Sequence, residues 1–469
     1  MSVNDGNGLT TKLASFYSAL DYEALSPQVV DRAKYFCLDY LAVALRGSTT
    51  PSSAAMQKVV RTLSPGGDSV IMGTSFRASP EYAALANGTA AHSLEMDDVN
   101  NDSSLHPGVA VFPAIFACGD LAGSQDRAPI QGRDVIVSTA TGYDLMIRIG
   151  RALDPRKHYA RGFHPTGTCG TFAAALVASN LLGLDTERTS WALGIAGSQA
   201  AGSLEFLAQG AWTKRMHPGW AAHSGLVAAI LAKEGFIGPT SILEGRDGFL
   251  HGYSDAADVD KTAEGLGDVF YINKTSIKPH ACCRYNQGPI DCILDIVHTN
   301  DLKAQEVEKV KVGVLKAGFN VVAAPEEQKR NPKNIIDAQF SMPFGAAIAI
   351  TYGQASLDEY TEEMLGRSDI KDLMNRVECV QDPALEVNYP SQWPAWVEVE
   401  TRDGRKLKSQ IEYPKGDPEN ALTWDELKDK FRNLTQPVIS PSRQEEIINA
   451  VDSLEALDDV RVLTRMTSA

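Results

Sequence analysis

The spacing of apolar residues predicts a mostly helical chain up to about residue 270. In the first clear pattern an apolar residue recurs every three or four positions from Val30 to Ala44, which is the period of one helix face. Ser26 and Pro27 stand just ahead of it and are typical of a helix start, and Gly47 suits its end. Similar Ala-rich patterns predict six further helices, over residues 80–94, 111–122, 135–153, 171–182, 190–201 and 221–233.

After residue 270 the pattern changes to the alternation of apolar and polar residues that is typical of strands. Three segments alternate in this way, residues 307–314, 396–401 and 406–413. Asp403-Gly404 separates the last two and favours a hairpin turn. Helical patterns then return in residues 423–433 and 441–457.

The simplest interpretation is a mainly α protein with a discontinuous large domain. Residues 1–271 and 414–469 are expected to form one all-helical domain from both ends of the chain. Residues 272–413 are expected to form a smaller α+β domain inserted in it.

The composition is that of a soluble globular protein, with 43% hydrophobic and 22% charged residues. These values exclude disorder and collagen-like structure as descriptions of the whole chain. The net charge of −15 argues against nucleic acid or an anionic membrane as a partner, because phosphate binding needs a basic surface. The most apolar segments, such as residues 108–118 and 344–350, are too short to span a bilayer.

The cysteines and the N-terminal residues predict a reducing, aqueous compartment, which we take to be the cytoplasm. The chain has seven cysteines, an odd number, and no Cys-x-x-Cys pair. Neither a disulfide framework nor a usual structural zinc site is therefore expected. Residues 1–11 lack the basic and apolar pattern of a signal peptide.

Three carboxylates lie within four positions at the end of the predicted helix 80–94. They are Glu95, Asp97 and Asp98, and two histidines, His92 and His106, stand on either side. If the helix continued, Glu95 and Asp98 would share a face and Asp97 would point away. Clustered carboxylates need a cation, a shared proton or hydrogen bonds. A solvated helix end is the alternative, although acidic residues are unfavourable at a helix C-terminus.

A second polar segment, residues 161–170, carries His164 in a loop rich in Gly and Thr ahead of the helix predicted at 171–182. Backbone N–H groups at a helix start favour anions. By itself, however, the pattern favours an ordinary helix start with His164 on the surface. Nearby His158 is also predicted to lie on the surface.

Two basic segments follow in this acidic chain. Lys214 and Arg215 stand with a histidine between two tryptophans in residues 212–220, and Lys278 and Arg284 stand in residues 278–285. Lysine and arginine bind carboxylates, so both segments are candidates for an anion site, with a solvated basic loop as the alternative for the first. We interpret the paired cysteines Cys282-Cys283 as packing residues rather than metal ligands.

Several common active-site motifs are absent from the chain. No Walker loop or GxGxxG stands at a strand-to-helix junction, and no GxSxG elbow occurs. The remaining carboxylates, imidazoles and cations suit acid–base chemistry on an anion.

Together these segments resemble the MmgE/PrpD family, which includes 2-methylcitrate dehydratase, cis-aconitate decarboxylase and iminodisuccinate epimerase. The resemblance rests on residues 91–107, 162–170, 210–225 and 276–285, with Asn87-Gly88, Gly142-Tyr143, residues 193–196 and residues 244–246 supporting it in order. It implies a cofactor-free enzyme for small polycarboxylates. It also implies a helical domain with a smaller α+β lid domain, and a homodimer.

The resemblance also implies a set of site residues. The acidic residue, two histidines and two lysines of cis-aconitate decarboxylases fall on Glu95, His106, His164, Lys214 and Lys278. This chain departs from the animal decarboxylases in three places: Glu95 stands for their Asp, Val99 for a pocket Thr, and Val322 or Ala323 for a lid Tyr. These departures weaken a specific assignment to cis-aconitate decarboxylation.

Our hypothesis is that two histidines move the proton while the cations hold the substrate. His106 and His164 would accept and donate a proton at the carbon next to a carboxylate, because histidine titrates near neutral pH. Lys214 and Lys278 would bind substrate carboxylates, helped by Arg215 or Arg284.

Three further residues have a possible part in this site, in which no metal or cofactor is expected. Glu95 or Asp97 would orient a histidine or complete the acid–base set. Tyr143 is a further proton-transfer candidate, with core packing as its alternative. These groups are expected to converge on one cleft.

Several functions remain open from the sequence. A lyase, either a dehydratase or a decarboxylase of a citrate- or aconitate-like acid, is expected first, and an epimerase of an iminodisuccinate-like dicarboxylate second. A metal-dependent hydrolase with Glu95, Asp98 and His106 as ligands is a third possibility. A non-catalytic organic-anion binder is the fourth.

Overall fold

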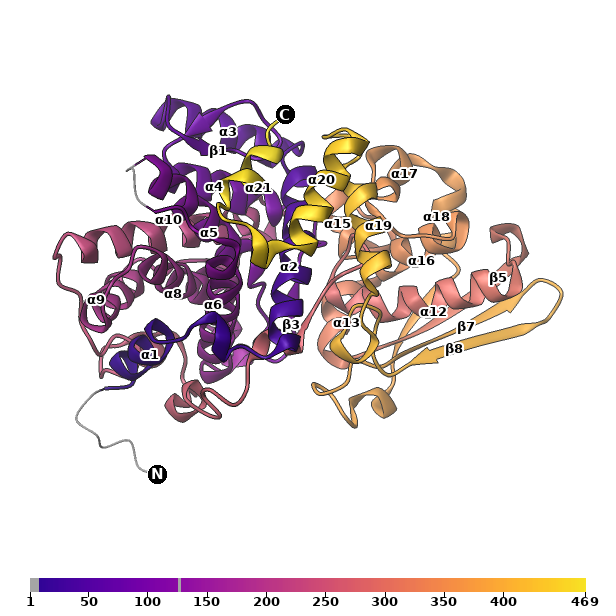
Figure 1. Cartoon of the computed structure of the whole chain (residues 1–469). Helices are drawn as coiled ribbons and strands as arrows, with labels where there is room; N and C mark the ends of the chain where they lie inside the picture. Colours follow the sequence, from indigo (N-terminus) through magenta and orange to yellow (C-terminus); the bar gives the residue numbers. More distant parts are fainter. Residues whose placement is uncertain (1–7, 125–127) are drawn as a thin grey trace. The chain divides into compact units, whose positions relative to one another are not determined.

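The computed structural model describes residues 8–124 and 128–469. The chain divides into two compact units, each described here by itself (Figure 1). The helical unit comprises the chain up to Ser93, Asp97–Thr275 and Thr423–Ala469. The α+β unit comprises Leu94–Met96 and Ser276–Leu422.

The helical unit contains a bundle of helices drawn from both ends of the chain. They are α1 (Leu9–Ser18), α2 (Pro27–Gly47), α3 (Pro51–Leu63), α4 (Pro80–Ala91), α5 (Gly108–Ser124), α6 (Gly132–Ala152), α7 (Pro155–Ala160), α8 (Pro165–Leu181), α9 (Thr186–Gly197), α10 (Thr213–Lys233), α11 (Phe249–Tyr253), α19 (Trp424–Thr435), α20 (Pro441–Asp452) and α21 (Arg461–Met466). The short strands β1 (Ser69–Val70) and β2 (Arg77–Ala78) pair antiparallel. Strand β3 (Val99–Asn100) precedes α5, and β4 (Thr275–Ser276) lies where the chain leaves this unit.

Small residues let the central helices of this unit pack closely. Helix α8 packs against α5, α6, α9 and α10, and α10 also packs against α4. A Cβ atom added at Gly88 would lie 2.6 Å from the Cα atom of Gly219, and one at Gly225 would lie 2.5 Å from the Cβ atom of Ala174. Glycine at these positions is therefore required by the close approach of α10 to its neighbours.

The C-terminal helices return to the N-terminal ones. Helix α19 packs on α2, where Lys430 pairs with the buried Asp39 at 2.6 Å. The indole of Trp424 donates to Asp31 at 3.0 Å. Helix α2 begins as predicted, because the Ser26 hydroxyl accepts from the N–H of Val29 at 3.3 Å.

The α+β unit packs helices against one four-stranded sheet. Its helices are α12 (Arg284–Asn300), α13 (Lys316–Val322), α14 (Glu326–Arg330), α15 (Ile335–Gln339), α16 (Met342–Tyr352), α17 (Glu362–Gly366) and α18 (Ser368–Met374). The sheet has the order β6-β5-β7-β8, with β5 (Val307–Val314), β6 (Val377–Gln381), β7 (Ala395–Thr401) and β8 (Lys406–Ile411). Strand β5 is parallel to β6 and antiparallel to β7. The predicted hairpin is confirmed in β7 and β8, which pair antiparallel around Gly404 at φ 88°.

The predicted fold class is confirmed: a mainly α protein with both chain ends in the helical part and a smaller α+β part. Several predicted helix limits were wrong, and three of them lie near the candidate site residues. Helix α4 ends at Ala91 rather than at residue 94, while α8 and α10 begin at Pro165 and Thr213, well before residues 171 and 221. The prediction took the residues rich in Gly and Thr before residue 171 as a loop, whereas they form the first turns of α8. Pro165 fits its first turn, where the missing N–H costs no helical hydrogen bond. Within the described residues, no helix is long and apolar enough to cross a bilayer.

Candidate active site

Four imidazoles cluster inside the helical unit. The ring centroids are 5.0 Å apart for His92 and His106, 5.8 Å for His92 and His164, and 5.2 Å for His164 and His217. His92 follows α4, His106 precedes α5, His164 precedes α8, and His217 lies in α10. The exposed fractions of His92, His164 and His217 are only 0%, 2% and 6%. The packed ends of four helices therefore bring these histidines together.

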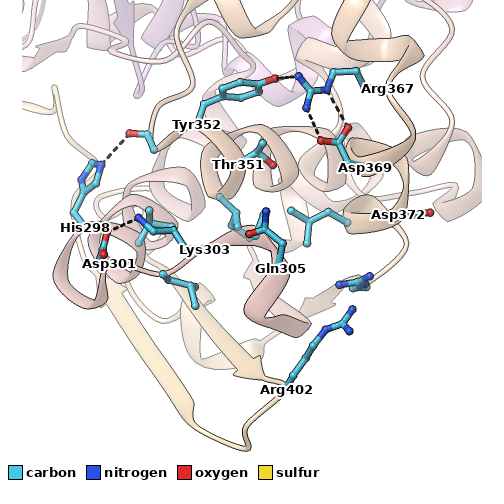
Figure 2. A pocket seen from close by; sticks show the side chains of 17 residues that line it. His298, Asp301, Lys303, Gln305, Thr351, Tyr352, Arg367, Asp369, Asp372 and Arg402 are labelled. Atoms are coloured by element: carbon cyan, nitrogen blue, oxygen red, sulfur yellow. Dashed lines mark hydrogen bonds and ion pairs between the residues drawn. The ribbon is translucent and has the colours of Figure 1, made fainter.

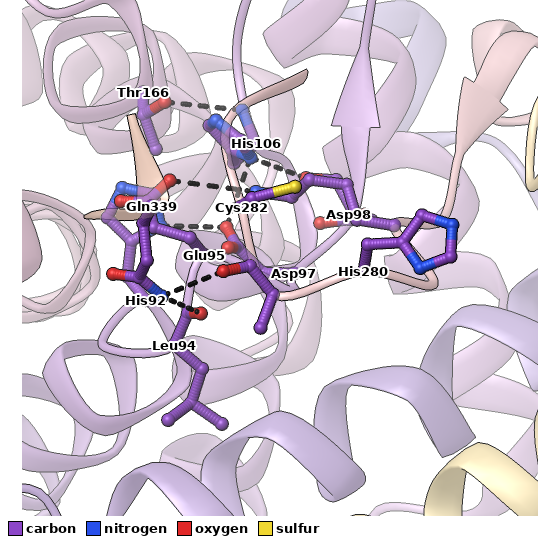
Figure 3. A network of polar contacts seen from close by, with 12 residues as sticks. His92, Leu94, Glu95, Asp97, Asp98, His106, Thr166, His280, Cys282 and Gln339 are labelled. Carbon is purple, nitrogen blue, oxygen red and sulfur yellow. Dashed lines mark hydrogen bonds and ion pairs between the residues drawn. The ribbon is translucent and has the colours of Figure 1, made fainter. Parts of the chain in front are cut away.

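Asp97 orients two of these imidazoles (Figure 3). Its Oδ2 atom lies 2.7 Å from Nδ1 of His92 and 3.0 Å from Nδ1 of His106. Nδ1 of His106 also lies 2.6 Å from the backbone oxygen of Asp98. Both neighbours of the His106 Nδ1 atom are acceptors, so this nitrogen carries the hydrogen and Nε2 carries the lone pair.

The expected helix face for Glu95 and Asp98 was wrong. Helix α4 has ended before this segment, and Glu95 adopts a left-handed conformation with φ 58°. The turn that follows directs Asp97, rather than Asp98, toward the imidazoles. A positive φ at a residue other than glycine is uncommon and marks a conformation held by the surrounding structure.

Asp98 faces a different set of partners. Its two carboxylate oxygens accept from the N–H of Gly108 at 3.1 and 3.2 Å. Burial raises the pKa of Asp98. Burial, and then the Asp98 carboxylate, raise the pKa of Tyr143. Tyr143 is fully buried and packs on Phe36 and Phe112, so it combines a core position with contact to a site carboxylate.

His164 is paired with His217 on the other side of the cluster. Their Nδ1 atoms lie 3.0 Å apart, so one imidazole donates a hydrogen and the other accepts it. Burial lowers the pKa of His164 most, and the charges of His92, His217 and Lys214 lower it further. The surface position that the sequence favoured for His164 is excluded by its 2% exposure.

The prediction that His158 lies on the surface was wrong. The side chain is fully buried, with Nδ1 2.9 Å from the Tyr253 backbone oxygen and Nε2 2.9 Å from the Thr168 hydroxyl. Its ring stacks on Phe163. Aromatic side chains enclose the imidazole, and its hydrogen bond to Thr168 connects it to the start of α8. The local sequence does not reveal this packing.

The cations of the first basic segment lie in the first turn of α10. The positive charge of Lys214 contributes to the lowered pKa of the cluster imidazoles, after burial. Arg215 donates from Nη1 to the Ser52 hydroxyl at 3.0 Å, and this hydroxyl lies 3.2 Å from that of Ser93. Lys214 therefore places a cation at the histidine cluster, while Arg215 supports the chain just before Leu94.

The other predicted residues belong to the α+β unit. Lys278 is 1% exposed, and its Nζ atom lies 3.7 Å from Oε2 of Glu95. The side-chain amide of Gln339 donates to the backbone oxygens of Leu94 and Ala281, each at 3.0 Å. Arg284 pairs with Asp417 at 2.5 Å. Glu95 therefore lies beside Lys278, and the Gln339 amide binds the backbone of both segments, at Leu94 and at Ala281.

Cys282 and Cys283 are buried in the α+β unit, as packing residues are. Burial raises the pKa of the Cys282 thiol, which favours the uncharged form. Their interpretation as packing residues rather than metal ligands stays a prediction.

One group of side chains has the spacing of metal ligands. Among the described residues, His92, Asp97 and His106 offer ligand atoms that lie within 4.8 Å of one another. This set differs from Glu95, Asp98 and His106, which the sequence suggested for a metal-dependent hydrolase. The observed hydrogen bonds give each of the three groups a role that needs no ion, because Asp97 accepts from both imidazoles.

A cavity of about 900 Å³ lies in the α+β unit (Figure 2). Two of its cations pair with acidic residues: Lys303 with Asp301 at 2.5 Å, and Arg367 with Asp369 at 2.5 Å. His298 contacts the backbone oxygen of Gly353 at 2.9 Å. None of the residues predicted for the site lines this cavity.

Comparison with known proteins identifies the family. The MmgE/PrpD N-terminal domain matches residues 11–262, and the MmgE/PrpD C-terminal domain matches residues 280–456. The chain belongs to the MmgE/PrpD family. The resemblance inferred from the sequence is thereby confirmed.

Relatives within the MmgE/PrpD family are similar over almost the whole chain. The cis-aconitate decarboxylase-like protein oryM of Aspergillus oryzae is 29% identical, with 100% of this chain and 98% of that protein covered. The cis-aconitate decarboxylase of Aspergillus terreus is 28% identical, covering 99% and 96%. The 2-methylcitrate dehydratase of Salmonella typhimurium is 22% identical, covering 92% and 90%.

Two cluster histidines of this MmgE/PrpD chain had been given no role from the sequence. His92 stands five residues before Asp97, and His217 stands three residues after Lys214. The spacing of His217 would have placed it near Lys214 on one helix face, had the start of α10 been predicted correctly. No regular spacing indicated that His92 contacts Asp97, because the two residues meet across an irregular turn.

Proposed function

We propose that this protein is an acid–base lyase that acts at the carbon next to a carboxylate of a small tricarboxylic acid. The observation that supports this most is the buried histidine cluster oriented by Asp97, with the positive charge of Lys214 beside it. A neutral imidazole with a directed lone pair suits proton removal, and a nearby cation favours an anionic substrate.

His106 is proposed as the general base. Its Nδ1 hydrogen is committed to Asp97 and to the backbone oxygen of Asp98, which leaves the lone pair on Nε2 available. Asp97 becomes a stronger partner as His106 gains positive charge, so it stabilises the protonated imidazole that forms in the transition state. His164, on the other side of His92, is proposed as the second proton-transfer residue.

Lys214 and Lys278 are proposed to bind substrate carboxylates, with Arg215 and Arg284 in support. Proton removal next to a carboxylate, or loss of CO2, places negative charge on the substrate, so contacts to lysine strengthen in the transition state. Glu95 is proposed to take part together with Lys278, from which its carboxylate is 3.7 Å away. Tyr143 is proposed to assist through Asp98.

Decarboxylation of an aconitate-like acid is the reaction that the relatives favour. The relatives named for cis-aconitate decarboxylation are 28–29% identical in the two Aspergillus proteins, against 22% for the dehydratase of Salmonella typhimurium. Dehydration of a citrate-like acid is the second candidate. The comparisons add no support for the epimerase alternative.

Two further properties are proposed on other grounds. A cytoplasmic location rests on the cysteine content of the sequence. A homodimer rests on the family resemblance alone.

The reaction can be tested with the purified protein in deuterated water. The protein is incubated with cis-aconitate, citrate and 2-methylcitrate, and the products are followed by NMR together with CO2 release. We expect CO2 release from an aconitate-like acid, with deuterium placed at the carbon that is protonated. Deuterium exchange without loss of CO2 or water would support an epimerase, and no turnover or exchange would support an anion binder.

Variants and a chelator separate the proposed chemistry from its rivals. His106→Gln is expected to lower kcat by about 10³-fold, since positioned acid–base groups contribute about 10²- to 10⁴-fold. His251→Gln, at an exposed histidine of α11, is the matched control and should leave kcat unchanged. A metal-dependent hydrolase predicts loss of activity with a chelator and recovery with a divalent ion, whereas our proposal predicts no effect.

A further inference from the structure

His217 lies between the buried His164 and a cavity beside α10. Its Nδ1 atom is 3.0 Å from Nδ1 of His164. The side chain also lines a cavity of about 560 Å³, together with Phe206, Met216 and Trp220. His164 itself is only 2% exposed. Protons from water in this cavity can therefore approach His164 through His217.

We propose that His217 is a positioning residue that relays protons between His164 and the cavity beside α10. The inference rests on the proposed function, because it gives His164 a route for exchanging protons while substrate is bound. A cavity of this size has room for several water molecules. Lyases that release CO2 need such a route, since the electron pair left on carbon takes up one proton in each turnover.

The two imidazoles can pass a proton without accumulating charge. The transfers are concerted: a proton from water in the cavity binds Nε2 of His217 while the Nδ1–H of His217 passes to Nδ1 of His164. His164 releases its Nε2–H to the substrate carbon, where the new C–H bond uses the electron pair left by CO2. One proton enters the pair and one leaves, and both imidazoles end neutral in the opposite tautomer. After the product leaves, the reverse transfer restores the starting tautomers: water in the emptied site protonates Nε2 of His164, and Nε2 of His217 releases a proton to the cavity.

The surroundings of His217 favour this neutral relay. The ionisable groups around it are His164 before α8, His92 after α4, Lys214 on its own helix, and Glu205, which lines the same cavity. Burial lowers the pKa of His217 to about 4, and His92 and Lys214 contribute to the same direction. Above about pH 5 the resting pair therefore shares one hydrogen instead of holding an extra proton.

The test compares His217→Ala and His217→Gln with wild-type enzyme and with His223→Gln. His223 lies on the same helix and stacks on Trp220 at 5.1 Å, so it is a matched control outside the pair. Both His217 variants are expected to lower kcat about tenfold to hundredfold with little change in KM. Added imidazole should raise kcat of His217→Ala in proportion to its concentration, while wild type, His217→Gln and His223→Gln show no such response.

Two results would overturn the relay. One is wild-type kcat in His217→Gln, and the other is a folded, slow His217→Ala that imidazole does not accelerate. If His217→Ala fails to fold, a larger solvent deuterium isotope effect on kcat in His217→Gln serves instead, and an unchanged isotope effect would contradict the proposal.

The relay and the proposed function can fail separately. If the wild-type protein turns over none of the acids, the lyase assignment fails. The relay is then judged by nitrogen NMR of labelled histidine. It requires one Nδ1–H shared by His164 and His217, and a changed His164 Nδ1 signal in His217→Ala. An unchanged His164 signal in folded His217→Ala would reject it.

Discussion

Ionisable side chains are buried in the histidine cluster of the helical unit, whereas those of the ion pair Arg367–Asp369 in the large cavity of the α+β unit are exposed to solvent. In the cluster, burial lowers the pKa of His92 and His217 to about 4 each, so the imidazoles stay neutral. In the cavity, the Arg367 guanidinium lowers the pKa of Asp369, so both groups stay charged. Arg367 and Asp369 have side-chain exposures of 39% and 54%.

This difference shows why the size of a cavity alone does not identify an active site. Exposed ion pairs contribute little, because water already solvates their charges. Burial lowers the pKa of the cluster imidazoles. Ionisable groups with a perturbed pKa are typical of functional sites. The cluster, rather than the larger cavity, therefore carries the proposed chemistry.

Of the three changes that test this contrast, Asp97→Asn is expected to have the largest effect, although a smaller one than His106→Gln. The amide oxygen of asparagine can still accept from the Nδ1–H groups of His92 and His106, but it carries no charge and stabilises a protonated His106 far less than the carboxylate does. We expect kcat to fall about 100-fold, within the range for acid–base groups, while the melting temperature shows that the variant is folded. Steady-state kinetics with an aconitate-like acid measures this effect. Wild-type kcat in a folded Asp97→Asn would remove Asp97 from the mechanism.

An intermediate effect is expected in the pH dependence of stability. The pKa of His92 falls from its ordinary 6.5 to about 4 on folding, so the unfolded chain binds more protons between these values. Its contribution to the free energy of unfolding is therefore full above about pH 6.5 and is lost as the pH falls toward 4.

Urea unfolding of wild type and His92→Gln from pH 7.5 to 4.5 measures this contribution. The decrease in unfolding free energy toward acid should be smaller in His92→Gln, which lacks the titrating imidazole. Because the other ionisable groups are common to both proteins, their contributions cancel in the difference. Parallel curves would show that His92 is not held neutral by burial.

The smallest effect is expected in the cavity of the α+β unit. Arg402 lines that cavity, lies 3.8 Å from Glu308, and has a side-chain exposure of 55%. Arg402→Ala should leave kcat/KM within about twofold of wild type, because a solvated pair at this distance is weak. A tenfold loss in kcat/KM would show that this cavity takes part in the reaction and would break the contrast.

Much of the fold was predictable because it depends on local patterns. The helix that begins after Ser26 followed from its cap and its apolar period, and the structure confirms the hydrogen bond of the cap. The hairpin at Gly404 followed from alternation and a turn residue that accepts positive φ. The starts of α8 and α10 were missed, since Gly, Pro and Thr there read as loop.

The sequence by itself determined the helical periods, the change to strands, and the kinds of residue available for chemistry on an anion. Only the tertiary structure decided which of them meet. His164 and His217 are 53 residues apart in the chain and come within 3.0 Å through helix packing. Asp97, rather than Glu95 or Asp98, faces the imidazoles because the chain turns at a positive φ after α4. Burial then lowers the imidazole pKa values, and burial depends on residues distant in sequence, which no local pattern encodes.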